Sequence, residues 1–324
     1  MRALRCVEYG PPEGLAFAEF PGPEPAADEV LVEVRCCAVS FFDTLFIQGL
    51  YQIKPPVPFI PGAEVAGVVA EVGADAADRF RPGDRVIALT WTGGLAERVC
   101  VGVDELVRLP ETVGFDAGAA MVMAYGTAAL GLDGEARLQA GETVLVLGGG
   151  GGVGGAAIDI AKARGATVIA AASGADKLAL CRDRGADHLI DYGREDLKTA
   201  IRDRFGSVDV IFDPLGGAFT EAALRCIAKG GRHLIIGFAA GEIPRIPMNL
   251  PLLKQARNVG VDWGDFSRRD PVASAARNAE LMAEVETGRL TPRAGRSYPF
   301  ADAPQAFRDI IDRTAVGRSV VWID

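Results

Sequence analysis

The feature that most constrains the fold is a glycine-rich run. The stretch from Val144 to Ala166 reads VLVLGGGGGVGGAAIDIAKARGA, and Gly148 to Gly152 are consecutive glycines. Glycine loses more conformational freedom on folding than any other residue, so such a run needs a local cause. A strand-like apolar stretch precedes the run and a helix-like stretch follows it. A strand that turns sharply into a helix exposes backbone N–H groups that, with the helix dipole, bind phosphate.

Two glycine registers fit a dinucleotide-binding turn. Gly149, Gly151 and Gly154 match G-x-G-x-x-G, while Gly148, Gly151 and Gly154 match G-x-x-G-x-x-G. Glycine is needed where the chain turns tightly and where a side chain would block the phosphates. A flexible linker is the alternative, but a linker would not lie between Val-Leu-Val-Leu and an Ala/Ile-rich helix. The run therefore predicts a dinucleotide site.

The second strand of this region indicates which dinucleotide is bound. An acidic residue roughly twenty positions after the glycines would bind the ribose 2′-hydroxyl of NAD. The tip of that strand instead carries Ser173 and Gly174, with Lys177 close behind. A hydroxyl and a lysine suit a 2′-phosphate, so NADP(H) is favoured. Asp176 complicates this prediction, and we expect it in the first turn of the next helix, where the dipole stabilises acids.

Strands and helices alternate from about Ala124 onward. This alternation predicts an α/β fold with a parallel sheet covered by helices on both faces. The expected strands are Thr143–Leu147, Thr167–Ala172, His188–Ile190, Val208–Asp213 and Arg232–Gly237. The expected helices between them are Gly152–Arg164, Ala175–Arg184, Asp196–Phe205 and Phe219–Lys229.

The first 120 residues or so have a different pattern, with β-type runs separated by Pro-Gly turns. They predict a β-rich body with one short embedded helix. Ser40 and Asp43 are spaced like a capping box, and Gly49 would end that helix. After about Ser267 we expect two helices, near Val272–Thr287 and Ala303–Arg313, and a final strand, Ser319–Ile323.

Composition excludes several functions. The 324 residues carry a net charge of −9, whereas nucleic-acid binding favours a basic face. Hydrophobic residues make up 49%, yet no segment is expected to span a membrane, and the N-terminus does not resemble a signal peptide. We therefore expect a cytoplasmic protein without nucleic-acid or membrane partners. The six cysteines form no zinc-site spacing and are expected to be reduced and mostly buried. The two histidines, His188 and His233, adjoin apolar runs and are expected to be packed strand residues.

Several stretches together resemble the zinc-free quinone oxidoreductase (zeta-crystallin-like) branch of the medium-chain dehydrogenase/reductase superfamily. They are VSFFDTLFIQGLYQIKPPVPFIPGAEVAGVV, AYGTAAL, the glycine-rich stretch through ASGADK, GADHLIDY, VDVIFDPLGG and AVGRSVV. The resemblance covers nearly the whole chain. It implies a GroES-like catalytic domain (1–123 and 268–324), a Rossmann NADP(H)-binding domain (124–267), NADPH in the cleft between them, and a homodimer.

At two positions the sequence differs from the zinc-dependent members of the same superfamily. Those relatives carry a Gly-His-Glu motif, which here reads Gly62-Ala63-Glu64, and their first zinc cysteine aligns with Ser40. A catalytic zinc needs about three protein ligands. We therefore predict no metal.

The resemblance also assigns cofactor and substrate residues. Thr127 would contact the nicotinamide end. The pyrophosphate would lie on the glycine turn, including Gly148, Gly151, Gly152, Val153 and Gly154. Ser173, Lys177 and Tyr192 would hold the 2′-phosphate, and Phe238, Ala239, Ala240 and Arg318 would complete the site.

The candidate catalytic residues are Tyr51, Ser40 and Asp43. Tyr51 would lie at the substrate mouth, either stacking on the substrate or donating to its oxygen. Its alternative role is a packed aromatic over the proline-rich loop that follows, and Asp43 has an alternative role as the helix-cap partner of Ser40.

The predicted reaction is hydride transfer from NADPH to a conjugated carbonyl, with negative charge developing on an oxygen that donors must stabilise. The acceptor is a quinone or, alternatively, the C=C bond of an enone or of an enoyl or acrylyl thioester. A CoA ester would favour basic residues at the cleft mouth, for which Arg245, Lys254, Arg268 and Arg269 are candidates. A different class of function is an NADPH-binding, crystallin-like structural or sensing protein without useful turnover.

Overall fold

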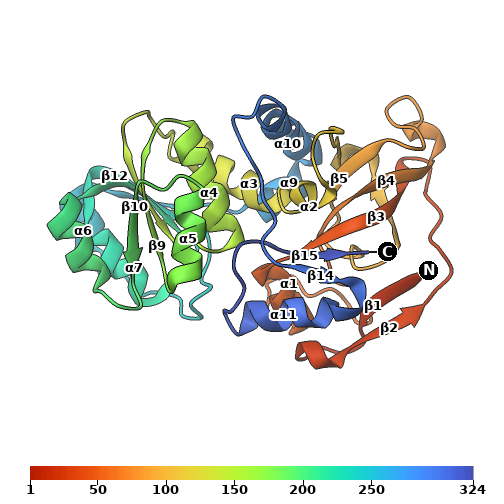
Figure 1. Ribbon diagram of the computed structural model, residues 1–324, viewed down its shortest axis with the longest axis horizontal. Coiled ribbons are helices and arrows are strands. Elements are labelled where there is room, and N and C mark those ends of the chain that lie inside the picture. The colour runs from red at the N-terminus through yellow and green to blue at the C-terminus, as the bar shows by residue number, and fades with distance from the viewer. Residues whose placement is uncertain (324) are drawn as a thin grey trace. The chain divides into compact units, whose positions relative to one another are not determined.

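The structure is a computed structural model that describes residues 1–323, and the chain divides into two compact units. Unit 1 comprises Met1–Met123, Phe266–Gly288 and Pro292–Asp324, and unit 2 comprises Ala124–Asp265 and Arg289–Thr291. Each unit has its own sheet and its own core (Figure 1).

The main sheet of unit 1 has seven strands, six of them in the order β14-β15-β3-β4-β5-β7, while β6 pairs with β3. A separate antiparallel pair, β1 and β2, opens the chain. The C-terminal strand β15 lies antiparallel to β3, so the end of the chain returns to the sheet that its beginning builds. The strands are β1 (Arg2–Cys6), β2 (Leu15–Glu19), β3 (Glu29–Val39), β4 (Glu64–Val72), β5 (Arg85–Leu89), β6 (Arg98–Gly102), β7 (Leu106–Arg108), β14 (Ser297–Pro299) and β15 (Ser319–Trp322).

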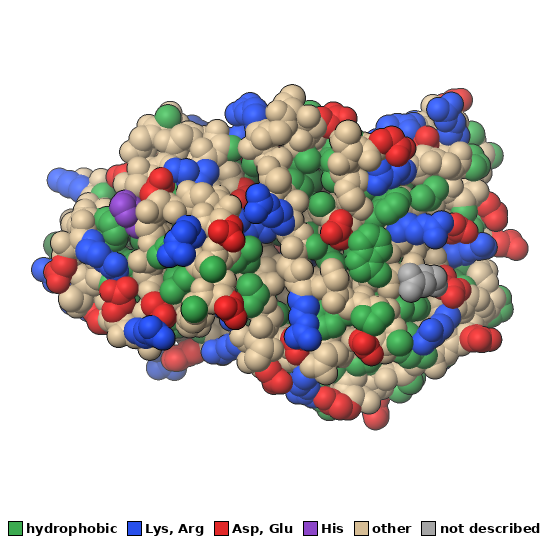
Figure 2. All heavy atoms as spheres, viewed as in Figure 1, with side chains coloured by type: hydrophobic (Ala, Val, Ile, Leu, Met, Phe, Trp, Pro, Cys, Tyr) green, Lys and Arg blue, Asp and Glu red, His purple; other side chains and the backbone are tan. Residues whose placement is uncertain are grey.

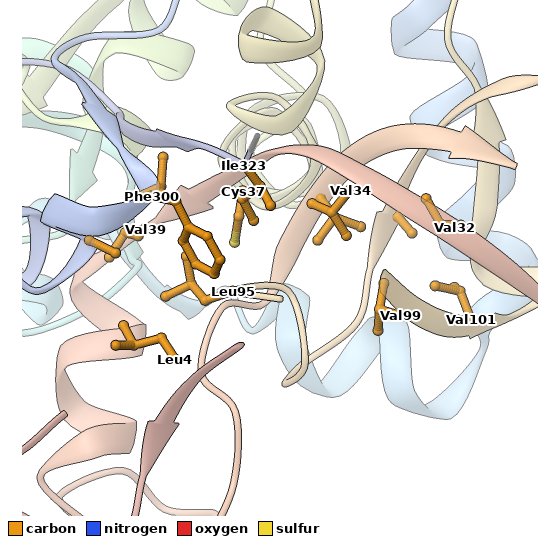
Figure 3. Packing of buried hydrophobic residues seen from close by; sticks show 14 of the residues in the cluster. Leu4, Val32, Val34, Cys37, Val39, Leu95, Val99, Val101, Phe300 and Ile323 are labelled. Carbon is orange, nitrogen blue, oxygen red and sulfur yellow. The ribbon is translucent and has the colours of Figure 1, made fainter. Parts of the chain in front are cut away.

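The core of unit 1 is built from residues far apart in the chain. Figure 3 shows Val32 of β3 near Val99 and Val101 of β6, and Cys37 of β3 near Leu95 and Ile323, all of them buried. The same cluster includes Leu4, Leu95, Phe300 and Ile323, so the two ends of the chain share one core. Burial of these aliphatic side chains is the main stabilising contribution to such a sheet.

Short helices complete unit 1. Helix α1 (Phe41–Ile47) follows β3, and the predicted capping box at its start is confirmed, because Ser40 and Asp43 exchange hydrogen bonds. The long helix α10 begins with Asp270 as its N-cap and a proline at the first position, a combination that favours helix initiation. The other helices are α2 (Phe115–Ala119), α9 (Trp263–Arg269, which crosses the unit boundary), α10 (Pro271–Glu286) and α11 (Ala303–Ile311), with 3₁₀ turns at η1 (Pro12–Gly14), η2 (Ala74–Ala76), η3 (Val103–Glu105) and η5 (Phe300–Asp302).

Unit 2 is a six-stranded parallel sheet in the order β10-β9-β8-β11-β12-β13. The chain winds outward from β8 in one direction and from β11 in the other, so the topology switches between these two strands. Such a switch point is where open α/β sheets bind ligands. The strands are β8 (Thr143–Leu147), β9 (Thr167–Ala172), β10 (His188–Asp191), β11 (Val208–Asp213), β12 (Ile227–Ile235) and β13 (Arg257–Gly260).

Helices on both faces of the sheet bury apolar strands such as Thr143–Leu147, and the predicted α/β class is confirmed. The helices of unit 2 are α3 (Val122–Ala129, which crosses the unit boundary), the π-helical turn η4 (Leu130–Glu135), α4 (Gly152–Ala163), α5 (Ala175–Asp183), α6 (Leu197–Phe205), α7 (Gly217–Leu224) and α8 (Asn249–Lys254).

One predicted helix, Phe219–Lys229, is wrong at its C-terminal end. Helix α7 stops at Leu224, and β12 begins at Ile227. Ile227 is fully buried and pairs with Val208 of β11, so tertiary packing overrides the helical propensity of the segment.

One stretch, Phe115–Glu135, is long and apolar enough by composition to cross a membrane, but 72% of its most apolar window is buried inside the molecule. Core helices of globular proteins pass the same test. On the face that Figure 2 shows, acidic and basic side chains are interspersed.

Candidate functional site

The turn between β8 and α4 requires glycine at several positions. Gly148 has a φ of +62°, in the left-handed region that favours glycine. A Cβ atom on Gly154 would lie 2.3 Å from the carbonyl oxygen of Gly148, an impossible contact. Such a close approach of strand end and helix is the general role of the third glycine in a dinucleotide-binding turn.

The first turn of α4 is open to an external acceptor. Its N-cap is Gly151, which provides no side-chain hydrogen bond. Gly152 and Val153 therefore carry first-turn N–H groups that lack an intrahelical partner. The geometry fits a pyrophosphate: amide donors, a helix dipole and no side chain in the way.

Three predicted residues meet at the tip of β9. A Cβ on Gly150 would lie 2.4 Å from Cβ of Lys177, so the lysine stem packs directly on the glycine turn. A Cβ on Gly193 would lie 3.6 Å from Cβ of Ser173, and the N–H of Tyr192 donates to Ala172 at 3.2 Å. The structure thus brings Ser173, Lys177 and Tyr192 to one place beside the uncapped start of α4. Asp176 lies in the first turn of α5, as predicted.

The loops after β11 and β12 border the same edge of the sheet. The N–H groups of Ala239 and Ala240 donate to the carbonyls of Pro214 and Leu215 at 3.0 and 2.8 Å. A Cβ on Gly148 would lie 3.1 Å from the Leu215 side chain, which links these loops to the glycine turn. Phe238, in the same segment, is 37% exposed.

Thr127 lies on α3 and is buried, with 8% exposure. Its neighbour Gly126 contacts the Trp263 ring so closely that a Cβ there would lie 2.5 Å from the ring atoms. Thr127 therefore occupies a buried position in unit 2, next to the close contact between α3 and Trp263.

Ser40 and Asp43 lie together in unit 1, both buried. Asp43 Oδ2 accepts from the backbone N–H and the hydroxyl of Ser40, both at 2.7 Å, and the N–H of Asp43 is 3.4 Å from Ser40 Oγ. Burial raises the pKa of the Asp43 carboxyl above its usual range, although the Ser40 bonds and the charge of Arg318 oppose the shift. The alternative role of Asp43 as a cap partner is thus present in the structure.

Asp43, Glu64 and Arg318 form a buried charged group that we call the unit 1 charge cluster. Glu64 is fully buried at the start of β4; it forms an ion pair with Arg318 and accepts from the N–H of Met123 at 2.8 Å. Burial lowers the pKa of Arg318 to about 10, and the charge of Asp43 opposes that shift. Arg318, predicted as a cofactor residue, is therefore also the counter-ion of two buried carboxylates.

Tyr51 belongs to an aromatic cluster in unit 1. Its ring centroid lies 4.6 Å from that of Phe42 and 5.3 Å from that of Phe46, while Phe42 lies 5.7 Å from Trp91. The Arg268 guanidinium lies 4.8 Å from the Trp91 ring centroid. Half-buried Tyr51 thus packs on α1, whereas Tyr9 bonds to the proline-rich loop through Pro55.

Metal ligands and thiols do not add to the site. Within residues 1–323 no group of three His, Cys, Asp or Glu side chains could hold a metal ion. The six cysteines are free, and all except half-buried Cys100 are buried, as predicted. His233 is buried on β12, as predicted, and contacts Asp213 and Asn258 at 3.2 Å each. The prediction of a packed His188 is wrong, because this residue of β10 is exposed, although its ring lies against Phe205.

The parallel sheet with its glycine turn and the mostly antiparallel, β-rich unit are together the architecture of a medium-chain dehydrogenase/reductase. Residues 26–125 match the alcohol dehydrogenase GroES-like domain, and residues 152–279 match the zinc-binding dehydrogenase domain.

Similarity to known proteins identifies the branch of this superfamily to which the chain belongs. The chain is 37% identical to quinone oxidoreductase-like protein 2 of Rattus norvegicus over 98% of its own length and 91% of the relative. The structure superposes on the Escherichia coli quinone oxidoreductase complexed with NADPH at a TM-score of 0.90, with 26% identity and full coverage of both chains. It also superposes on CurK enoyl reductase at 0.88, with 27% identity over 100% of this chain and 99% of that one. The chain belongs to the quinone oxidoreductase branch of the superfamily, as the sequence predicted.

Two groups of buried polar residues escaped the sequence analysis. Glu64 was noted only as part of a motif that lacks its histidine, although a charged residue opening an apolar strand is itself a signal. Tyr125, Asp159 and Arg184, which meet in unit 2, are too far apart in the chain for any spacing rule to connect them.

Proposed function

We propose that this protein is an NADPH-dependent oxidoreductase that reduces a quinone or another conjugated carbonyl without zinc. The observation that carries the proposal is the convergence of Ser173, Lys177 and Tyr192 at the tip of β9, beside the open start of α4. The three residues at the tip of β9 suit a 2′-phosphate, and the open start of α4 suits a pyrophosphate. The names of the quinone oxidoreductase relatives and the NADPH in the E. coli structure support it.

NADPH supplies a hydride when it is bound, and this chain's residues bind and orient it. First-turn amides of α4 would hold the pyrophosphate, Lys177 would pair with the 2′-phosphate, and Thr127 with Phe238–Ala240 would border the remainder. Tyr51 and the aromatic rings around it would provide a surface for a planar acceptor. Ser40 and Asp43 remain predicted catalytic residues, and their mutual hydrogen bonds favour a positioning role.

Zinc independence rests on Ser40 and Ala63, which stand where zinc-dependent relatives carry a cysteine and a histidine. Elemental analysis of the purified protein should find far less than one zinc per chain, and chelators should leave activity unchanged. About one tightly bound zinc per chain would overturn this part of the proposal.

The cofactor preference is tested by Lys177→Ala. A charge-assisted contact to phosphate is worth about 1.5–3 kcal/mol, so NADPH should bind roughly tenfold more weakly or worse, while NADH binding stays nearly unchanged. Lys229→Ala, an exposed lysine of the same unit, is the matched control and should change neither affinity. Equal losses for both cofactors would remove Lys177 from the 2′-phosphate site.

The role of Tyr51 is tested by two substitutions. Because its ring packs on Phe42 and Phe46, we expect it to stack on the substrate rather than to donate a proton. Tyr51→Phe should keep turnover within about tenfold, and Tyr51→Ala should mainly raise KM. A loss of about 100-fold in kcat for Tyr51→Phe at unchanged KM would make the hydroxyl catalytic.

A second candidate activity is reduction of an enone or an enoyl or acrylyl thioester, which the similarity to CurK enoyl reductase favours. NADPH oxidation with a panel of quinones, enones and acyl-CoA thioesters separates the two, because only C=C reduction yields a saturated product. Tight NADPH binding with no turnover across the whole panel would instead favour the crystallin-like alternative.

A homodimer is part of the proposal. Strand β13 is the edge of the parallel sheet, and an unpaired edge can pair with another chain. Nearby Ile243, Met248, Leu252 and Leu253 are 70–74% exposed, and α8 carries the last two. Light scattering should find a dimer that Leu253→Lys weakens, and a monomeric wild type would contradict it. Cytoplasmic location and the absence of nucleic-acid or membrane partners remain predictions.

A further inference from the structure

Tyr125, Asp159 and Arg184 form a buried hydrogen-bonded group that we call the unit 2 network. The Tyr125 hydroxyl donates to Asp159 Oδ2, and Arg184 Nη1 donates to the same oxygen. Arg184 Nη1 also lies 3.3 Å from the Tyr125 hydroxyl. The side chains of Arg184 and Asp159 are only 3% and 10% exposed, and Tyr125 is 2% exposed. A buried charge pair with a third polar partner is costly to break and is directional.

The helices are shaped to admit this network. A Cβ on Gly155 of α4 would lie 2.8 Å from Nε and 3.1 Å from Cζ of Arg184. The guanidinium therefore crosses α4 where that helix has no side chain. The pair of glycines Gly154 and Gly155 consequently has two separate tasks: the first lets the phosphate turn close, and the second admits Arg184.

Each member of the network comes from a helix that carries one part of the proposed cofactor site. Tyr125 lies on α3, two positions before Thr127. Asp159 lies on α4, whose N-terminus faces the glycine turn, and Arg184 is the C-cap of α5, whose first turns carry Lys177. Helices α3, α4 and α5 lie side by side in Figure 1. The residues assigned to the nicotinamide, the pyrophosphate and the 2′-phosphate thus lie on three different helices, and the unit 2 network connects these helices.

We propose that the unit 2 network positions α3 relative to α4 and α5, so that Thr127 meets the nicotinamide end of a dinucleotide already held at its phosphates. The Tyr125 hydroxyl joins α3 to the pair, and the Asp159–Arg184 ion pair joins α4 to α5. This inference rests on the proposed NADPH site. It assigns Tyr125, Asp159 and Arg184 as positioning residues, because none of them needs to touch the cofactor.

The Tyr125 hydroxyl holds α3, whereas the Asp159–Arg184 ion pair connects α4 to α5. Substitutions in these two parts of the network should therefore cause different binding defects. Adenosine 2′,5′-bisphosphate presents only the part of NADPH that α4, α5 and the tip of β9 would hold. Tyr125→Phe keeps the ring and removes the hydroxyl, so it releases α3 alone. Calorimetric titration of the purified full chain should show NADPH binding weakened about tenfold, which corresponds to about 1.4 kcal/mol. Binding of adenosine 2′,5′-bisphosphate should stay within about twofold.

Asp159→Asn removes the charge of the shared acceptor and weakens both joints, so it should weaken the binding of both ligands by about tenfold or more. Glu142→Gln is the control. Glu142 forms a two-pronged ion pair with Arg232 at 2.7 and 2.6 Å in the same unit, but at the opposite end of β8. This control should lower the melting temperature and leave both affinities unchanged.

The outcomes separate this inference from the proposed function. If the wild-type protein binds neither ligand, the NADPH site itself is wrong. If the wild type binds both ligands and Tyr125→Phe binds them equally well, or loses both in parallel, the network has only a structural role and the inference is overturned. Should Asp159→Asn fail to fold, Tyr125→Phe alone decides the question.

Discussion

The unit 1 charge cluster and the unit 2 network each hold a buried arginine beside a carboxylate, and the pKa values of the two arginines shift in opposite directions. In the unit 1 charge cluster, Arg318 faces Asp43 and Glu64, and burial still lowers its pKa to about 10. In the unit 2 network, burial would also lower the pKa of Arg184, but the Asp159 carboxylate and the Tyr125 hydroxyl overcome it and raise the pKa. Burial alone therefore does not decide the pKa of a buried guanidinium. Hydrogen bonds with Asp159 and Tyr125 add to the effect of their charges at Arg184 and raise its pKa.

This difference suggests different tasks. The unit 2 network is balanced in charge, with one carboxylate, one guanidinium and one phenol, which suits a rigid joint. The unit 1 charge cluster holds two acids for one base, and burial raises the pKa of Asp43. Such a surplus of negative charge is suited to holding the Arg318 guanidinium in a fixed position.

Among the tests of this difference, Arg318→Ala should have the largest effect on the free energy of unfolding. It leaves two buried carboxylates without their counter-ion, which should lower the free energy of unfolding by about 3–5 kcal/mol in urea titrations. Arg296→Ala is the control, because its ion pair with Asp309 involves a 61% exposed side chain and should cost less than about 1 kcal/mol. A loss below about 1 kcal/mol for Arg318→Ala would mean that the carboxylates are protonated or hydrated without it.

A smaller effect is expected from Asp159→Asn in unit 2. The amide keeps the shape and one acceptor, so the loss is that of a charge-assisted hydrogen bond, about 1.5–3 kcal/mol. The same urea titration measures it. If Asp159→Asn destabilised the protein more than Arg318→Ala, the ranking of the two groups would be reversed.

Ser40→Ala tests the helix cap that adjoins the unit 1 charge cluster, because Ser40 is hydrogen-bonded to Asp43. Loss of the N-cap of α1 should cost about 1 kcal/mol. Ser40→Asp can replace the cap but adds a charge beside Asp43, so it should not restore stability as Ser40→Thr does. Full stability of Ser40→Ala would show that the backbone bond to Asp43 is sufficient.

The smallest effect concerns the slope of stability against pH. Burial would raise the pKa of the Asp213 carboxyl, but hydrogen bonds from His233 and Thr220 outweigh it, and the pKa is lowered. Asp213 therefore stabilises the folded protein at pH values above its unfolded pKa. This stabilisation is lost as pH falls through the folded pKa. The raised pKa of Asp43 acts in the opposite sense, because stability falls as pH rises from about 4 through its folded pKa.

Unfolding free energies measured from pH 3 to 7 should therefore change slope in opposite directions for two matched variants. Asp213→Asn should flatten the acid limb, and Asp43→Asn should make stability rise more steeply with pH above about 4. Slopes that change in the same direction would contradict one of the two environments.

Local patterns predicted local structure well. The glycine turn, the Ser40–Asp43 box and strands such as Val208–Asp213 depend on neighbouring residues, whose spacing reports helix and strand directly. The resemblance then identified the family, which the relatives confirm.

Features that depend on distant residues could not be predicted in this way. Asp159 lies 34 positions from Tyr125 and 25 from Arg184, and only the packing of three helices makes them neighbours. Strand β13 and helices α8 and α9 were not expected, because these short segments gain their form from the sheet beside them. The end of α7 was misplaced for the same reason.

Glycine precedes the first turn of three helices in unit 2: Gly151 before α4, Gly174 before α5 and Gly216 before α7. By contrast, α6 is closed by the Asp196 side chain. The three glycine-capped helices all start where parallel strands end. At α7 the N–H groups of Gly216 and Gly217 donate to the Asp213 side chain and to the carbonyl of Glu242, so the open backbone donors lie at the starts of α4 and α5. In hydrogen-exchange experiments these amides should exchange fast in the free protein and slow on ligand binding, so these two helix starts serve as an intrinsic reporter of occupancy.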